Sequence, residues 1–129
     1  MSTDSRDAVT EAAVRERLDR VTDPELDTSI VELEYIDEIR IDGDEVRVAM
    51  TLPTAWCSPA FAWMMTTDAR DEVAALPGVA HARIELREHM HEREINRGVN
   101  ERLSFGEAFP DADGSVAPVR TELDEKARI

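Results

Sequence analysis

Cys57 is the one cysteine of the chain, and its sequence position favours chemistry. It precedes Ser58 and Pro59, a pair that is typical of a helix start, because serine is a common N-cap and proline is favoured in the first turn. Free amide groups and the positive end of a helix dipole would stabilise a thiolate there, and a thiolate could bind a metal or attack an electrophile. The alternative is that Cys57 is a small buried apolar residue, as free cysteines often are.

Carboxylates and imidazoles elsewhere in the chain could add ligands to a metal. Asp23 and Glu25 flank Pro24 in a rigid turn, so their carboxylates could bind a metal or orient a thiol, although Asp-Pro is also an ordinary turn. His89 and His91 follow a predicted strand and would project to one side if that strand continued; two solvated histidines are the alternative. With one cysteine, no Cys-rich array can enclose a metal within one protomer.

Motifs of common enzyme classes are absent from the sequence. There is no nucleophile elbow, no GxGxxG or Walker A pattern and no HExxH pattern. A cysteine nucleophile remains open, with Cys57 served by His89 or His91, because the sequence does not determine whether these residues meet. Trp56, next to the cysteine, could instead line a pocket or a partner surface.

The composition indicates one acidic domain. The 129 residues suffice for a single modest core, and the net charge is −14, from 29 acidic against 15 basic residues. Nucleic acid is therefore not expected as a partner, because phosphates are bound through basic side chains. Many carboxylates with a single lysine, Lys126, also suit a halophilic origin, where salt screens self-repulsion; an ordinary acidic protein from a GC-rich genome is the alternative. No apolar stretch suits a membrane helix and no leader pattern is visible, so we expect a cytoplasmic protein that does not enter a membrane.

Hydrophobic periodicity predicts the order helix, strand, hairpin, strand, helix, strand. Apolar residues three or four apart indicate helices, and alternating β-branched residues indicate strands. Asp42-Gly43-Asp44 between the first two strands is a hairpin signal. The expected ranges are helix 8–20, strand 35–41, strand 46–52, helix 59–76 and strand 79–86.

This order predicts the α/β class, as an α+β sandwich with a small three-stranded mixed sheet and helices packed on one face. We expect the domain to span residues 8–88. Residues 89–129 are strongly charged and end in a turn-rich stretch, so we expect a C-terminal extension that is partly helical and partly flexible. Within it, Ser104 and Glu107 have the spacing of a capping box.

Three ordered motifs resemble a known family. Residues 21–25 carry an Asp-Pro-Glu entry that is continued by residues 29–33; residues 50–52 precede Cys57 as a strand precedes the family cysteine; residues 76–79 match a helix-to-strand turn. Over about residues 14–86 the chain resembles the SufT and PaaD group of iron-sulfur cluster assembly proteins. Its tail is more similar to the branch associated with multicomponent monooxygenases.

The resemblance implies a carrier or adaptor that helps mature iron-sulfur or iron-dependent client enzymes, without turnover of its own. It implies Cys57 as a ligand to iron or to a transiently bound iron-sulfur cluster, with Asp23 or Glu25 as an oxygen ligand or a positioning group. Because one cysteine leaves the site short of ligands, a homodimer, a small thiol or the client would complete it. The expected partners are the client enzyme and other iron-sulfur assembly proteins.

The chain also departs from the family pattern. Glu34 stands at a usual glycine, Pro53 at a threonine, Ala55 at a proline, and Ser58 at the proline that follows the cysteine. We therefore expect a different client or ligand. The competing hypothesis is an interaction module that holds no metal and docks a monooxygenase or an assembly partner through Trp56 and Cys57.

Overall fold

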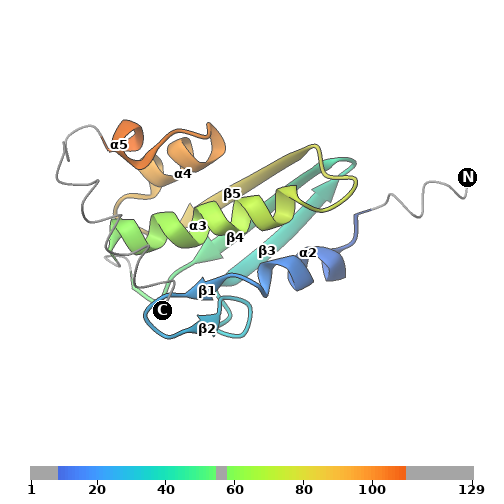
Figure 1. Cartoon of the computed structure of the whole chain (residues 1–129), viewed down its shortest axis with the longest axis horizontal. Helices are drawn as coiled ribbons and strands as arrows, with labels where there is room; N and C mark the ends of the chain where they lie inside the picture. Colours follow the sequence, from blue (N-terminus) through green and yellow to red (C-terminus); the bar gives the residue numbers. More distant parts are fainter. Residues whose placement is uncertain (1–8, 55–57, 110–129) are drawn as a thin grey trace, which may run out of the picture.

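The computed structural model describes residues 9–54 and 58–109, so Trp56 and Cys57 lie outside the described residues. Figure 1 shows one layer of strands with helices against it. The elements are α2 Glu11–Leu18, β1 Thr22–Asp23, β2 Thr28–Ser29, β3 Ile36–Asp42, β4 Glu45–Thr51, α3 Pro59–Ala74, β5 His81–Arg87, α4 Glu92–Asn100 and α5 Phe105–Ala108. Each expected helix and strand is present, with its ends shifted.

The main sheet has three strands in the order β3-β4-β5. β3 and β4 form an antiparallel hairpin in which Gly43 adopts a positive φ of 62°, as the Asp-Gly-Asp signal predicts. β4 and β5 are parallel, with α3 as the crossover between them. The expected α+β class with a three-stranded mixed sheet is confirmed.

The core lies between this sheet and the helices. Alternate side chains of β4 and β5 are fully buried on the helical face: Val46, Val48, Met50, Ile84 and Leu86. α3 crosses this face in Figure 1, and α2 packs against α3 and β3. In the part of the chain that the structure describes, no helix covers the other face of the sheet, which carries exposed charged side chains such as Arg47 and Arg83. Within the described residues, no helix has the length and apolar character needed to span a membrane.

Two local features differ from the sequence expectations. Asp23-Pro24-Glu25 was expected to be a rigid turn, and Pro24 and Glu25 do lie in a turn. The residues on either side of this turn were not expected to pair, but they form the two-stranded β1–β2 sheet, in which Asp23 pairs with Thr28. Ser58 was expected to cap α3, but its side chain makes no capping hydrogen bond.

The capping box of α5 is confirmed, because Glu107 and Ser104 each accept a hydrogen bond from the other's backbone amide. The Ser104 backbone N–H thereby lowers the pKa of Glu107.

Helix α4 belongs to the same core as the sheet. Its Ile95 and Val99 are buried with the side chains of β4 and β5. Two asparagines on α4 face the outer edge of β5: Asn100 exchanges two hydrogen bonds with the backbone of Ile84, and Asn96 exchanges two with Leu86. Asparagines four residues apart on the helix can reach residues two apart on the strand, because four helical residues and two strand residues both span about 6 Å along their axes.

Glu34 ends a helical turn in the left-handed region, with φ of 61°. The Tyr35 N–H donates to the Ile30 carbonyl and the Glu34 N–H to the Val31 carbonyl, which is the Schellman pattern. Glycine is favoured at such a position because a Cβ is strained there. Glu34 is therefore strained at a position that suits the glycine expected there from the resemblance.

Replacing Glu34 with glycine should therefore raise the free energy of unfolding by about 0.5–1 kcal/mol, since relief of the strain exceeds the added entropy of the unfolded chain. Urea unfolding followed by circular dichroism measures the change. Glu32→Gly is the matched control: Glu32 is exposed in the same turn and is not in the left-handed region, so glycine there should destabilise. Equal effects at both positions would contradict the strain argument.

Candidate functional site

The two parallel strands end at the same edge of the sheet. Thr51, the last residue of β4, is in register with Arg87, the last residue of β5. The connection from β4 to α3 and the turn from β5 to α4 therefore both leave from this edge, which is where the carboxyl ends of parallel strands usually present functional groups. The candidate site is built from the described residues around this edge.

Asp23 is connected through Tyr35 to the edge of the sheet at which β4 ends. Its side chain is 6% exposed; Oδ1 accepts a hydrogen bond from the Glu25 backbone N–H at 2.9 Å, and Oδ2 accepts one from the Tyr35 hydroxyl at 2.7 Å. The Tyr35 carbonyl in turn accepts the Thr51 N–H at 2.9 Å. Asp23 thus couples the β1–β2 turn to the end of β4 and holds that turn in shape.

Glu25 differs from Asp23 in its setting, because it is exposed in the turn between β1 and β2. Its backbone amide, and not its carboxylate, is what meets Asp23. The expected carboxylate pair is therefore divided into one buried group with two donors and one group open to solvent. The sequence did not indicate Tyr35 as the partner of Asp23, although a tyrosine in an apolar run is a plausible buried donor.

His89 and His91 lie close together in the turn after β5, with ring centroids 5.9 Å apart. His89 is 5% exposed and His91 is half-buried, so the alternative of two solvated histidines does not describe His89. The His91 backbone N–H donates to His89 Nδ1 at 3.0 Å, and this assigns the proton of a neutral His89 to Nε2. In that arrangement Nδ1 is already used, so it is not available to a metal.

An aromatic cluster packs against the turn that contains His89 and His91. His91 packs edge-on against Phe109 at 5.6 Å, and Phe109 stacks on Phe105 at 4.7 Å. Trp63 of α3 meets both phenylalanines edge-to-face. The sequence analysis missed the two phenylalanines; the confirmed capping box that starts α5 was the available signal that this segment folds back on the domain.

The N-terminus of α3 follows the cysteine directly in sequence. The helix has Pro59 in its first turn, no side-chain hydrogen bond from Ser58 and no acidic residue in its first turn. Although the chain has a net charge of −14, the first turn of this 16-residue helix contributes no carboxylate to balance the positive end of the helix dipole.

The described side chains do not form a complete metal site. In residues 9–54 and 58–109 there is no group of three or more His, Asp or Glu side chains that could hold a metal ion. Asp23 lies in β1 and His89 in the turn after β5, and neither belongs to such a group. Cys57 lies outside the described residues.

A solved structure shares this fold. The chain is similar to the crystal structure of a domain of unknown function, DUF59, from Bacillus anthracis, at 20% sequence identity and a TM-score of 0.56, over 71% of this chain and 89% of that chain. No curated protein matches the chain. The chain belongs to the iron-sulfur cluster assembly protein family, whose model matches residues 11–86.

Proposed function

We propose that this protein is a carrier or adaptor in iron-sulfur cluster assembly, with Cys57 as its ligand to iron or to a transient cluster. The family supplies the general role, and the start of α3 is the observation that carries the finer assignment. Residue 57 immediately precedes a long helix whose first turn has neither a side-chain cap nor a carboxylate. Such a helix end favours a nearby thiolate, and the thiolate is the form that binds iron.

Asp23 acts in this proposal as a positioning residue. Both of its oxygens accept hydrogen bonds from the chain, so it holds the β1–β2 turn against Tyr35, whose carbonyl accepts the N–H of Thr51 at the end of β4. Glu25 is the more accessible carboxylate and would be the oxygen ligand of the pair. His89 would contribute only if the contact with the His91 amide broke, which frees Nδ1 or lets the proton move there from Nε2.

One thiolate with one carboxylate does not complete the coordination of iron or a cluster. The remaining ligands would come from a second protomer, a small thiol or the client enzyme. Incomplete coordination suits a carrier, because a cargo that the carrier fully encloses is harder to release. The protein would then act by transfer to other iron-sulfur proteins, without turnover of its own.

Anaerobic reconstitution with iron and sulfide tests the proposal. Wild-type protein should retain iron after desalting and show a visible chromophore, whereas Cys57→Ser should lose most of both, because serine does not replace thiolate as a soft ligand. Metal and sulfide analysis, the visible spectrum and sedimentation of the loaded protein are the measurements. Equal iron retention by both proteins would overturn the role of Cys57, and a loaded monomer would exclude the homodimer.

A metal-free docking module is the second candidate function. Leu26 and Met90 are the large apolar side chains that the described residues leave most exposed, at 56% and 65%. Leu26 lies in the β1–β2 turn and Met90 between the two histidines, so both lie in turns of the candidate site. A docking module should keep client binding and client activation in Cys57→Ser, and a carrier should lose activation.

A further inference from the structure

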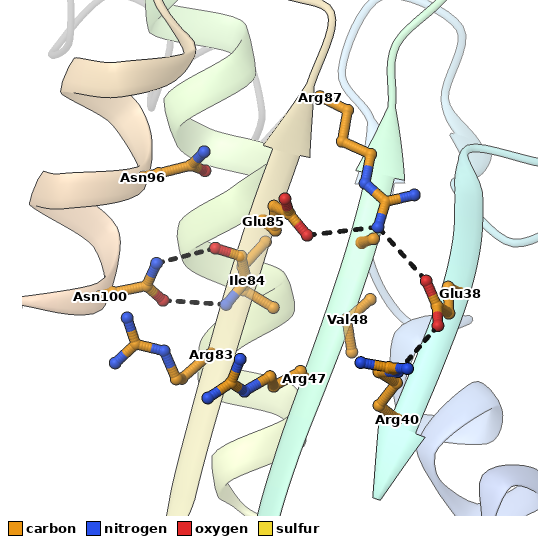
Figure 2. A pocket seen from close by; sticks show the side chains of 11 residues that line it. Glu38, Arg40, Arg47, Val48, Arg83, Ile84, Glu85, Arg87, Asn96 and Asn100 are labelled. Atoms are coloured by element: carbon orange, nitrogen blue, oxygen red, sulfur yellow. Dashed lines mark hydrogen bonds and ion pairs between the residues drawn. The ribbon is translucent and has the colours of Figure 1, made fainter.

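The uncovered face of the main sheet contains a hollow of about 300 Å³. Residues from all three strands line it, together with Asn96 and Asn100 of α4 (Figure 2). Its charged residues are four arginines, Arg40, Arg47, Arg83 and Arg87, and two glutamates, Glu38 and Glu85. Four positive charges against two negative charges give the lining a formal charge of +2, or +1 with Glu45, which pairs with Arg47 beside the hollow, whereas the whole chain carries −14. We call it the arginine hollow.

Three of the arginines form one row across the sheet. Arg40 of β3 pairs in register with Arg47 of β4, and Arg47 pairs in register with Arg83 of β5. Like charges directly opposite on neighbouring strands destabilise a sheet. Two such pairs in a row are unexpected in a chain with only 15 basic residues, and local arrangements that oppose stability are typical of functional sites.

The ion pairs on this face of the sheet do not balance the positive charge of every arginine in the row. Arg87 pairs with Glu38 and Glu85, each at 3.3 Å, and the hydrogen bond to Glu38 raises the pKa of Arg87. Arg40 pairs with Glu38 and Arg47 with Glu45, each at 3.0 Å. Within residues 9–54 and 58–109, the structure gives Arg83 no ion pair. Figure 2 shows Arg47 and Arg83 beside one another, below Asn100.

We propose that the arginine hollow binds a small polyanion, a molecule with two or more phosphate or carboxylate groups. A guanidinium group can bind two oxygens of a phosphate group, or both oxygens of a carboxylate group, in a bidentate manner. The row spans two strand separations, about 10 Å, which two or three linked anionic groups can bridge. An anion between the arginines would convert each repulsive pair into two attractive contacts. This binding site is separate from the candidate site at the strand ends and does not rest on the proposed function.

A second copy of the chain is disfavoured where a two-fold axis passes through the hollow. Such an axis would place one arginine row against the other and increase the repulsion. An acidic protein segment would carry suitable charges, but a hollow of about 300 Å³ is the size of small-ligand sites rather than of a protein interface. The acidic segment is therefore an outcome of the test rather than the proposal.

Calorimetric titration of the full chain with pyrophosphate, citrate and a hexaglutamate peptide tests the proposal. At low salt we expect pyrophosphate or citrate to bind, with an affinity that falls as salt is added. Arg47→Gln and Arg83→Gln should each weaken binding about tenfold or more, since each removes charged hydrogen bonds. Arg20→Gln is the matched control, because Arg20 is exposed beside Glu72, outside the hollow, and binding should not change.

The two small probes distinguish phosphate from carboxylate as the preferred group. Absence of heat with both, or unchanged binding in the two hollow variants, would overturn the proposal. Tighter binding of the peptide than of either probe would overturn it in favour of an acidic protein partner. Without ligand, Arg83→Gln should melt at or above the wild-type temperature, because the variant removes one repulsive pair and none of the ion pairs described above, and a clear decrease would contradict the argument from repulsion.

Discussion

Gly98→Ala is expected to lower the free energy of unfolding by about 2 kcal/mol or more, although alanine is the better helix former by about 1 kcal/mol. A Cβ at Gly98 would lie 2.5 Å from two ring atoms of Trp63 and 2.7 Å from the Cβ of Ala108. Trp63 is 5% exposed and is confined by Phe105 and Phe109, so its ring has little room to move. Urea unfolding of the full chain measures the loss.

Gly106→Ala is the matched control for this prediction. Gly106 also lies in a helix, but no heavy atom stands within 4 Å of the Cβ that it would gain. We expect that variant to be as stable as the wild type or slightly more so. Trp63→Leu should restore part of the loss in the double variant with Gly98→Ala, because the two residues are in contact. If Gly98→Ala unfolds like Gly106→Ala, α4 does not pack on α3 as described.

Asp23→Ala is expected to destabilise the protein by about 1–3 kcal/mol, because it removes the buried carboxylate that accepts hydrogen bonds from the Tyr35 hydroxyl and the Glu25 amide. The matched control is Glu25→Ala, which removes the exposed carboxylate of the same motif and should change stability by less than about 0.5 kcal/mol. Thermal unfolding of both variants separates these effects.

The two variants also divide the roles in iron binding. In the proposed carrier, Glu25→Ala would weaken iron retention without a change in stability, whereas Asp23→Ala would lower stability first. If Asp23→Ala is as stable as the wild type and loses iron, Asp23 is a ligand rather than a positioning residue.

The fold was largely predictable because its strands and α3 are strongly patterned. Alternation in β4 and the Asp-Gly-Asp hairpin are local signals, and each is matched by the structure. The β1–β2 pairing was missed because strands of two residues have no detectable period, and their pairing depends on the tertiary contact between Asp23 and Tyr35. The Asn96 and Asn100 contacts were also missed because they are tertiary contacts. In the sequence, each asparagine is typical of an ordinary polar helix residue.

The candidate site was predicted only in part. Asp23, Glu25, His89 and His91 were identified by residue type, but sequence spacing did not reveal that one carboxylate is buried and the other exposed. The role of Cys57 stays a prediction. The arginine row was not foreseen at all, because strand register determines it and Arg40, Arg47 and Arg83 are far apart along the chain.

The asparagines of α4 also determine how two such chains could share a sheet. A strand at a sheet border normally offers open amides and carbonyls that can recruit a strand from another molecule. On β5 these groups at Ile84 and Leu86 are already taken by Asn100 and Asn96. Strand addition, whether in a dimer or in an aggregating fibre, would therefore have to begin at β3, and loss of the two asparagines would open a second growth end.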